Sequence, residues 1–253
     1  MILGRDVLVM NVSVSRDALS GGSSLSPFIS IIIPAFNEDK TVGRIVSETV
    51  SLMWSRGLSY EIIVVNDGST DKTHSEASQP GVIVLSNEKN RGKGYCLRKG
   101  LEKARGDIVV MMDSDGEHRP QDIMRLLELI FSGKDVVAGS RFLNGNSNFT
   151  SRAHFLGNHF FNFAILAMTG RYVTDSQTGF RAMRRKVLDE LSLESDGYEI
   201  ETEITVKTLR NGFTFAEVPV SSQRREYGFS RIKLVADGTK ILKTILKSSF
   251  ALV

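Results

Sequence analysis

The chain has 253 residues, of which 41% are hydrophobic and 24% charged, and its formal net charge is +3. This length fits one large α/β domain or two small ones, and the composition is that of a folded globular protein. So mild a net charge gives no reason to expect a nucleic-acid partner. Cys96 is the only cysteine, which excludes an internal disulfide and favours a reducing compartment.

The first 27 residues differ from the rest of the chain. Arg5 and Asp6 interrupt them, so they lack the long apolar core of a signal peptide, and they end in the Ser/Gly-rich stretch 20–26. We therefore expect residues 1–27 to be a flexible lead-in. No apolar run reaches the roughly 18 residues of a membrane-spanning helix, which predicts a soluble or peripherally bound protein.

From residue 28 onwards, predicted strands alternate with predicted helices. Apolar, β-branched runs predict buried strands at 28–33, 61–65, 82–85 and 107–112. Helical spacing of apolar residues predicts helices at 41–54 and 94–104. Such alternation indicates an α/β fold with a mostly parallel sheet, whose ligands bind beyond the carboxyl ends of the strands.

The second half of the chain is less regular. Its patterns predict helices at 120–131, 187–191 and 199–209 and strands at 135–138 and 213–220. Segment 155–168 is strongly apolar and aromatic, and residues 232–252 fit an amphipathic basic helix with Ile241, Ile245 and Leu246 among lysines. Both segments suit a membrane surface, and the competing interpretation is that both cover the sheet as core helices. Four cations between Arg181 and Lys186 form a further basic stretch that suits anionic lipid or phosphate.

Carboxylates stand at three predicted strand ends. Glu38 follows the first strand, Asp67 the second, and Asp113 and Asp115 flank Ser114 after the fourth. A hard divalent cation such as Mg²⁺ or Mn²⁺ prefers carboxylate and phosphate oxygens, and it would neutralise a diphosphate held there.

Each of these loops also has a simpler interpretation. Asp-x-Asp-Gly is typical of a surface turn, which would leave the carboxylates without a ligand. Asn37 in the first loop, and Ser69 or Thr70 in the second, are candidate caps of the helices that follow. Helix capping and ligand binding are compatible, so the sequence leaves both interpretations open.

The order of the motifs resembles that of glycosyltransferase family 2. The segments that carry the resemblance are Pro34-Ala-Phe-Asn-Glu38, Asn66-Asp-Gly-Ser-Thr70, Arg91-Gly-Lys-Gly94, Asp113-Ser-Asp115 and Gly139-Ser-Arg141. Two further segments, Asp175-Ser-Gln-Thr-Gly-Phe-Arg181 and Arg224-Arg-Glu-Tyr-Gly-Phe-Ser-Arg231, resemble the polyprenyl-phosphate branch typified by dolichyl-phosphate mannose synthase. The resemblance extends from about residue 28 to residue 240. We accordingly expect a domain at 28–231 and a separate basic helix at 232–253.

The resemblance implies a GT-A fold, a Rossmann-like and mostly parallel sheet flanked by helices, with amphipathic interfacial helices in the second half. It implies an inverting transferase with a nucleotide-diphosphate sugar as donor and Mg²⁺ or Mn²⁺ as cofactor. The residues it assigns to the donor are Pro34, Phe36, Glu38, Asp67, Asp113 and Ser114. It assigns the metal to Asp113, Asp115 and Glu117, where the family commonly has Gln at the third position.

The resemblance also places cations near the donor and acceptor phosphates. Arg141 and Arg225 are implied to act in catalysis beside Asp115, and Arg225, Ser230 and Arg231 to bind the acceptor phosphate. Lys is more usual than Arg at position 231. His118 lies beside the carboxylates in sequence, without metal-ligand spacing to another histidine.

The chemistry of the acceptor separates two enzyme classes. A lipid monophosphate is already ionised at neutral pH, so it can attack the sugar without a protein base, and arginine binds phosphate bidentately. A family-related transferase that extends a glycan hydroxyl would instead need a carboxylate base, for which Asp175 and Glu201 are the first candidates. A third reading is a non-catalytic nucleotide-binding domain.

The leading expectation is transfer of a hexose to dolichyl or another polyprenyl phosphate at the cytoplasmic face of a membrane. GDP-mannose is the favoured donor, followed by UDP-glucose and UDP-N-acetylglucosamine. Peripheral binding or a membrane-anchoring subunit would bring the chain to that surface.

Overall fold

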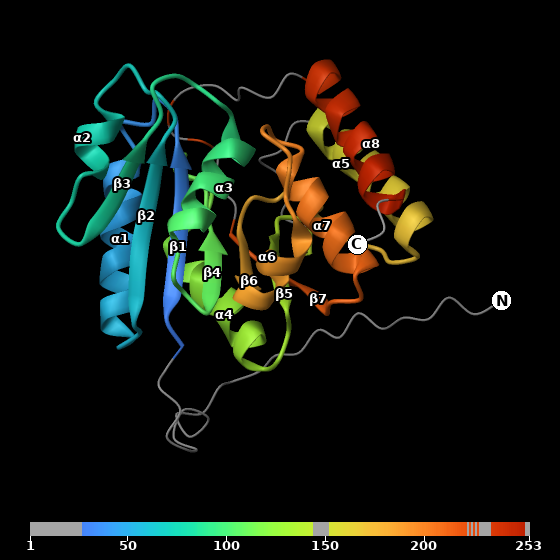
Figure 1. Cartoon of the computed structure of the whole chain (residues 1–253), viewed down its shortest axis with the longest axis horizontal. Helices are drawn as coiled ribbons and strands as arrows, with labels where there is room; N and C mark the ends of the chain where they lie inside the picture. Colours follow the sequence, from blue (N-terminus) through green and yellow to red (C-terminus); the bar gives the residue numbers. More distant parts are fainter. Residues whose placement is uncertain are drawn as a thin grey trace.

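The computed structural model describes residues 27–143, 152–221, 223, 225, 227 and 234–250. Its centre is a seven-stranded sheet with the strand order β3-β2-β1-β4-β6-β5-β7 (Figure 1). The predicted phosphate-binding residues Ser230 and Arg231 lie outside the described residues, as do residues 1–26 of the expected lead-in.

The sheet is parallel except for one strand. The parallel strands are β1 (Ile29–Ala35), β2 (Tyr60–Asn66), β3 (Val82–Ser86), β4 (Ile108–Met111), β5 (Val136–Ser140) and β7 (Phe215–Pro219). The exception, β6 (Arg181–Arg184), runs antiparallel between β4 and β5. The predicted mostly parallel sheet is therefore confirmed, whereas β6 has no counterpart among the predicted strands.

The strands form where apolar residues follow one another without interruption. Along β1, Ile31 and Ile33 are buried in one apolar cluster and Ile32 in another, so both faces of the strand are covered. Alternate side chains of a strand point to opposite faces, and a parallel sheet is buried on both. A continuous run of isoleucine is the sequence that suits such a position.

Most described helices lie where the sequence predicts them. They are α1 (Val42–Ser55), α2 (Thr73–Ala77), α3 (Lys93–Lys103), α4 (Ile123–Phe131), α5 (Arg152–Thr169), α6 (Arg185–Leu191), α7 (Ile200–Arg210) and α8 (Leu234–Phe250). No range was predicted for the five-residue α2, although the candidate caps Ser69 and Thr70 imply a helix after them. The predicted helix 120–131 begins as a 3-10 turn at Pro120–Asp122, which suits a proline that has no backbone N–H to donate.

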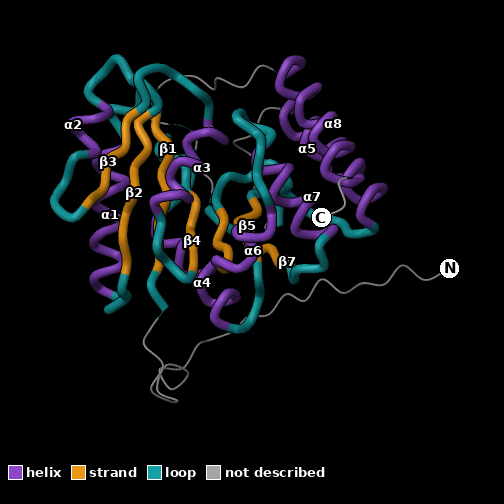
Figure 2. The backbone as a smooth tube through the Cα atoms, viewed as in Figure 1, coloured by secondary structure: helices purple, strands orange, loops and turns teal. Residues whose placement is uncertain are grey.

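The helices form layers around the sheet (Figure 2). The buried residues of α1 and α4 pack on one face, and those of α3, α6 and α7 on the other. Helices α5 and α8 pack against α7 and against each other, and share a third apolar cluster with it. The interpretation of both as core helices is therefore confirmed in part: each buries apolar residues, in a cluster centred on α7 that Phe215 of β7 also contacts.

The outer pair exposes part of its apolar surface. Leu156, Phe160 and Phe163 of α5 and Leu242, Leu246 and Phe250 of α8 are exposed to solvent. Ile241 and Ile245, part of the amphipathic pattern of the last helix, are buried in the cluster with α7. None of the described helices is long and apolar enough to cross a membrane.

Candidate active site

Four strand ends and one loop bring the candidate residues to one edge of the sheet. The loops after β1, β2 and β4 carry Glu38, Asp67 and the segment Asp113–Glu117, and Arg141 follows β5 directly. Because β6 is antiparallel, the loop that precedes it also ends at this edge and adds Asp175. The sequence predicted that the carboxylates after β1, β2 and β4 converge at this edge. The antiparallel direction of β6 explains why Asp175 lies there as well.

The first two loops are tied to each other. The backbone N–H of Asn37 donates to Ser69 Oγ at 2.9 Å, and the N–H of Thr70 donates to Asn37 Oδ1 at 2.9 Å. The N-cap residues of α1 and α2 are Thr41 and Lys72, without a side-chain cap bond. The alternative prediction that Asn37, Ser69 or Thr70 caps a helix is therefore wrong.

Asp67 is used to fix a neighbouring loop. Its carboxylate accepts hydrogen bonds from Asn87 Nδ2 at 2.7 Å and from the backbone N–H groups of Arg91 and Gly92 at 2.8 and 2.9 Å. These bonds leave the residue 3% exposed. In this structure Asp67 positions the 87–92 loop, and its contact with a nucleotide stays a prediction.

Ser114 also has a structural partner. Its hydroxyl donates to the carbonyl oxygen of Pro34 at 2.8 Å and is buried. The bond ties the loop after β4 to the end of β1. Ser114 thus fixes the direction in which Asp113 and Asp115 leave the strand, and its contact with the donor stays a prediction.

Asp113 is paired with a lysine that the sequence analysis assigned no role. Lys93 Nζ lies 2.5 Å from Asp113 Oδ1 and 2.6 Å from Glu201 Oε1. Burial opposes the ionisation of Asp113, but Lys93 outweighs it and holds the pKa of Asp113 below its usual value. Burial raises the pKa of Glu201, and Lys93 offsets this only in part. A Cβ atom at Gly179 would lie 2.4 Å from Lys93 Nζ, so only glycine leaves room for this pair.

Asp115 and Glu117 form the more open part of the site. The N–H of Glu117 donates to Asp115 Oδ1 at 3.0 Å, and Asp115 Oδ2 lies 3.9 Å from Arg225 Nη1. Arg225 also forms an ion pair with Glu38. Burial and the charge of Asp113 raise the pKa of Asp115, and burial together with Asp115 raises the pKa of Glu117 to about 7. Three negative groups therefore lie close enough to oppose one another's ionisation.

This donor set suits a hard divalent cation that shares its coordination with a substrate. Among the described residues, no three Asp, Glu, His or Cys side chains are arranged to hold a metal ion by themselves. Mg²⁺ usually takes only one or two carboxylates and completes its shell with substrate phosphate oxygens and water. Asp113, Asp115 and Glu117 supply oxygen ligands of this kind, and a cation would relieve their mutual repulsion.

Arg141 is held by a buried carboxylate. Its Nε and Nη2 atoms lie 2.7 and 2.9 Å from the two oxygens of Asp175, which is 0% exposed. Asn158 Nδ2 donates to the same carboxylate at 3.2 Å. Asp175, one of the two candidate bases, is therefore bonded to Arg141 through both oxygens. The other, Glu201, is buried and forms an ion pair with Lys93 through Oε1, whereas its Oε2 has no hydrogen-bond partner among the described residues.

His118 lies beneath the site. It is buried, and its ring stacks on Phe180 with 5.1 Å between the centroids. Burial and the charge of Arg141 lower the pKa of His118 to about 4. The imidazole is therefore neutral at physiological pH and too weak a base to draw a proton from a hydroxyl group.

Comparison with known proteins identifies the chain. The model for glycosyl transferase family 2 matches residues 30–192. The chain belongs to glycosyl transferase family 2. This confirms the resemblance that the order of motifs indicates.

Two relatives from this family have named activities. The UDP-N-acetylglucosamine–dolichyl-phosphate N-acetylglucosaminyltransferase of Methanococcus voltae is 33% identical over 245 residues, 86% of this chain and 94% of the relative. The dolichol-phosphate mannosyltransferase of Pyrococcus furiosus is 31% identical over 212 residues, 81% of this chain and 59% of the relative.

A solved structure confirms the fold. The glucosyl-3-phosphoglycerate synthase of M. tuberculosis superposes with a TM-score of 0.72 and 25% identity, over 94% of this chain and 84% of that one. The GT-A fold expected for a family 2 transferase is therefore correct.

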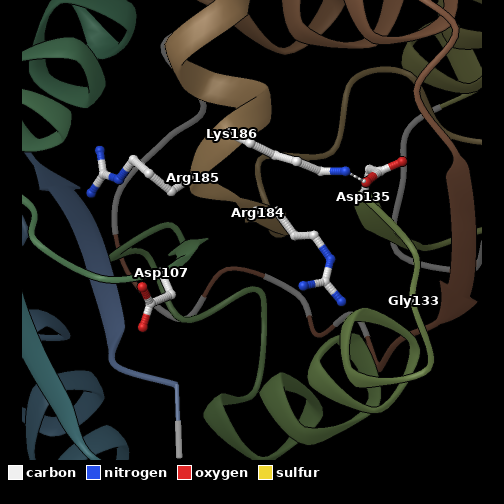
Figure 3. Close-up of a pocket in the computed structure, with 6 residues that line it drawn as sticks. All are labelled: Asp107, Gly133, Asp135, Arg184, Arg185 and Lys186. Carbon is white, nitrogen blue, oxygen red and sulfur yellow. Dashed lines mark ion pairs between the residues drawn. The ribbon is translucent and has the colours of Figure 1, made fainter. Parts of the chain in front are cut away.

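One hollow in this family 2 chain lies away from the strand ends described above. It has a volume of about 380 Å³ and is lined by Asp107, Gly133, Asp135, Arg184, Arg185 and Lys186 (Figure 3). Asp107 and Asp135 precede β4 and β5, so the hollow lies at the opposite edge of the sheet.

The cations of that hollow have structural partners. Arg184 donates to the carbonyl oxygens of Ile130, in the last turn of α4, and of Lys134, which follows that helix. Arg185 donates to those of Ala104 and Gly106, which follow α3. Arg181 is buried and bonded to backbone and hydroxyl oxygens. The prediction that Arg181–Lys186 is a basic surface for anionic lipid is therefore wrong, because at least three of its four cations stabilise helix ends and the core.

Proposed function

We propose that the chain transfers a hexose from a nucleotide-diphosphate sugar to a polyprenyl phosphate, with inversion at the anomeric carbon and with Mg²⁺ or Mn²⁺ as cofactor. The donor half of the proposal rests on the carboxylates at the strand ends. Family 2 membership and the position of Asp113, Asp115 and Glu117 beyond the carboxyl ends of parallel strands support it.

The engagement of both candidate bases is the observation that carries the acceptor half. Asp175 is 0% exposed and bonded through both oxygens to Arg141, and Glu201 is buried against Lys93. A hydroxyl acceptor needs a base that can receive its proton in the transition state. A phosphate monoester needs none, because it is already ionised. Both candidate bases are buried and each is paired with a cation, and this arrangement favours a phosphate as the nucleophile.

The reaction then consists of one displacement. A phosphate oxygen of the acceptor attacks the anomeric carbon from the face opposite the diphosphate, the bond from that carbon to the diphosphate breaks, and the nucleoside diphosphate leaves. No proton is transferred in this step. A divalent cation bound by Asp113, Asp115 and Glu117 would neutralise charge on the leaving group.

The cations of the site orient the two phosphates. Lys93, anchored on Glu201, presents a fixed positive charge beside Asp113 and hence beside the leaving diphosphate. Arg141 and Arg225 attract the acceptor phosphate and suppress the repulsion between two anions. Catalysis on this account rests on positioning and charge.

Two outer helices supply a surface for the lipid part of the acceptor. Exposed side chains of α5 and α8 include Phe160, Phe163 and Leu246, and the exposed lysines Lys240 and Lys243 lie on the same helix as Leu246. Apolar side chains that enter the acyl region, together with lysines at the level of anionic headgroups, are typical of interfacial helices. Peripheral contact of α5 and α8 with a membrane is thus part of the proposal.

The identity of the sugar is a separate question. The motif order favours GDP-mannose, whereas one named relative uses UDP-N-acetylglucosamine and another is a mannosyltransferase. We therefore keep GDP-mannose as the first donor to test, followed by UDP-N-acetylglucosamine and UDP-glucose.

Transfer of label into lipid tests the proposed function. The protein is incubated with Mn²⁺ or Mg²⁺, dolichyl phosphate and each labelled nucleotide sugar in turn, and the lipid is extracted. We expect label in the organic phase with one donor, and its loss on removal of the metal with EDTA. Extracts without label for every donor would refute the acceptor assignment, and transfer undiminished in EDTA would refute the metal assignment.

A further inference from the structure

Helix α5 has a buried polar side opposite its exposed apolar side. Asn158 and Asn162, four residues apart and so on one face of the helix, are both buried, whereas Phe160 and Phe163 are more than half exposed. A helix that merely covered an apolar core would place apolar residues at both buried positions. The two amides therefore require a partner inside the protein.

Their partner is the loop that carries Asp175. Asn162 Nδ2 donates to the carbonyl oxygen of Thr174 at 2.8 Å, and the N–H of Ser176 donates to Asn162 Oδ1 at 3.2 Å. Asn158 Nδ2 donates to Asp175 Oδ1 at 3.2 Å. Three consecutive residues of the loop are thus bonded to α5, and only the bond from Asn158 reaches a side chain.

That side chain is the counter-ion of Arg141. Asp175 Oδ1 accepts from both Asn158 Nδ2 and Arg141 Nη2, and Asp175 Oδ2 accepts from Arg141 Nε. A carboxylate buried this deeply stays in one orientation only while its lone pairs are satisfied by well-placed donors. Without Asn158, Asp175 Oδ1 would accept a hydrogen bond from Arg141 alone. The Arg141–Asp175 ion pair would then lose the bond that fixes the orientation of its carboxylate relative to α5.

The amide of Asn158 is retained at a cost. Among the described residues, its Oδ1 atom has no hydrogen-bond partner although it is buried, and an unsatisfied buried oxygen is unfavourable. Rotating the amide by 180° would place this oxygen against the carboxylate oxygen of Asp175, which is worse. The position therefore needs the N–H donor, which leucine of similar volume could not supply.

We propose that Asn158 is a positioning residue for Arg141, acting through Asp175, so that the helix bearing the exposed apolar face also supports the arginine of the acceptor side. The inference rests on the proposed function in one respect: it takes the substrate of Arg141 to be a phosphate. The hydrogen-bond relay itself is independent of the reaction.

Substitutions of nearly equal volume separate this role from packing. In Asn158→Leu the donor is lost, and we expect the KM for polyprenyl phosphate to rise about tenfold, as for a lost hydrogen bond to a charged group, with donor affinity unchanged. Asn158→Asp keeps the shape but places a second carboxyl against Asp175, so its KM should rise further. That excess should shrink as the pH falls, because a protonated carboxyl can donate as the amide did. Thr169→Val, which removes a hydroxyl bond to Ile165 on the same helix, is the matched control and should behave like the native protein.

A second readout does not depend on turnover. The Nε–H of Arg141, buried against Asp175, should exchange slowly with solvent in the native protein and in Thr169→Val, and several-fold faster in Asn158→Leu. Equal exchange in all three proteins would overturn the inference, as would a KM of Asn158→Asp that stays below that of Asn158→Leu as the pH is raised and the carboxyl ionises. If the native protein transfers no sugar to lipid phosphate, the proposed function fails while the exchange of Arg141 still decides the relay.

Discussion

Asp115 is the single residue whose replacement should separate chemistry from folding. Asp115→Asn keeps the volume of the side chain and an oxygen that can accept the N–H of Glu117. It removes a charge that the proposed metal needs, so initial rates of sugar transfer should fall about 10²- to 10³-fold. The melting temperature should stay or rise, because burial and Asp113 already disfavour the charged form of Asp115 and raise its pKa. A native rate at saturating metal would contradict the role of Asp115.

For single residues, the sequence predicted the positions of those that belong to motifs. It did not predict the roles of residues whose partners are distant in the chain. Asp113, Asp115 and Arg141 follow predicted strands, so their place at the sheet edge could be foreseen. The role of Lys93 depends on Glu201, and that of Asn158 on Asp175, and neither pairing is visible in any local pattern. Asp67 and Ser114 are predicted to bind the donor, and the structure adds a bond inside the protein for each side chain that no local pattern indicates.

The secondary-structure elements were predictable to different degrees for a physical reason. Long β-branched runs such as β1 and β2 fit a strand buried on both faces and little else. The four residues of β6 have arginine at both ends, so they contain no apolar run that would predict a strand. Arg181 is tolerated because hydrogen bonds to Thr178, Ser176 and Thr205 satisfy its guanidinium in the core.

The junction of β5, β7 and α6 depends on one carboxylate. Asp135, just before β5, bonds Thr214 before β7 and forms an ion pair with Lys186 of α6 at 2.7 Å. Burial opposes the ionisation of Asp135, but these hydrogen bonds outweigh it and lower its pKa to about 2. A carboxyl with a lowered pKa stabilises the folded state above its unfolded pKa of 3.8, and this stability is lost as the pH falls towards 2.

Asp135→Asn should therefore destabilise the protein at neutral pH by roughly 1 to 2 kcal/mol, a value reduced for the exposure of Lys186. Thermal melts of both proteins across pH 2 to 7 measure the effect. The gap in melting temperature should close between pH 4 and pH 2. A gap that persists unchanged at pH 2 would show that the charge of Asp135 is not its source.

The exposed face of α5 and α8 predicts a measurable affinity for membranes. Phe163→Ser combined with Leu246→Ser removes two large apolar side chains, each worth about 1.5 to 3 kcal/mol when buried. Flotation with vesicles of phosphatidylcholine and phosphatidylglycerol should show partitioning reduced by at least about tenfold.

The control for this experiment is a comparable residue elsewhere on the surface. Trp54 is 81% exposed at the end of α1, a helix that packs on the sheet and takes no part in the α5, α7 and α8 cluster. Trp54→Ser should leave flotation unchanged. Equal loss in both variants, or none in either, would refute the assignment of α5 and α8 as the membrane face.

In the whole molecule, the donor and acceptor functions are assigned to different parts of one fold. The carboxylates follow β1, β2 and β4, on the side of the sheet that contains the parallel strands β3-β2-β1-β4. The outer helices α5 and α8 pack on α7, on the side of the sheet that contains β5 and β7 (Figure 1). Arg141 follows β5, and its counter-ion Asp175 is bonded to α5. The arginine thus stands where the nucleotide end of the site meets the helices proposed to hold the lipid.

The central claim is that the nucleophile is a phosphate that requires no protein base. The most direct test offers the native protein, with metal and its nucleotide sugar, a polyprenyl phosphate and the polyprenol with the same chain. The account predicts glycosylation of the phosphate alone, at a rate that Asp115→Asn lowers about 10²- to 10³-fold. Glycosylation of the free alcohol at a comparable rate would contradict it, because that reaction requires a base, whereas Asp175 is bonded to Arg141 and Glu201 is buried in an ion pair with Lys93.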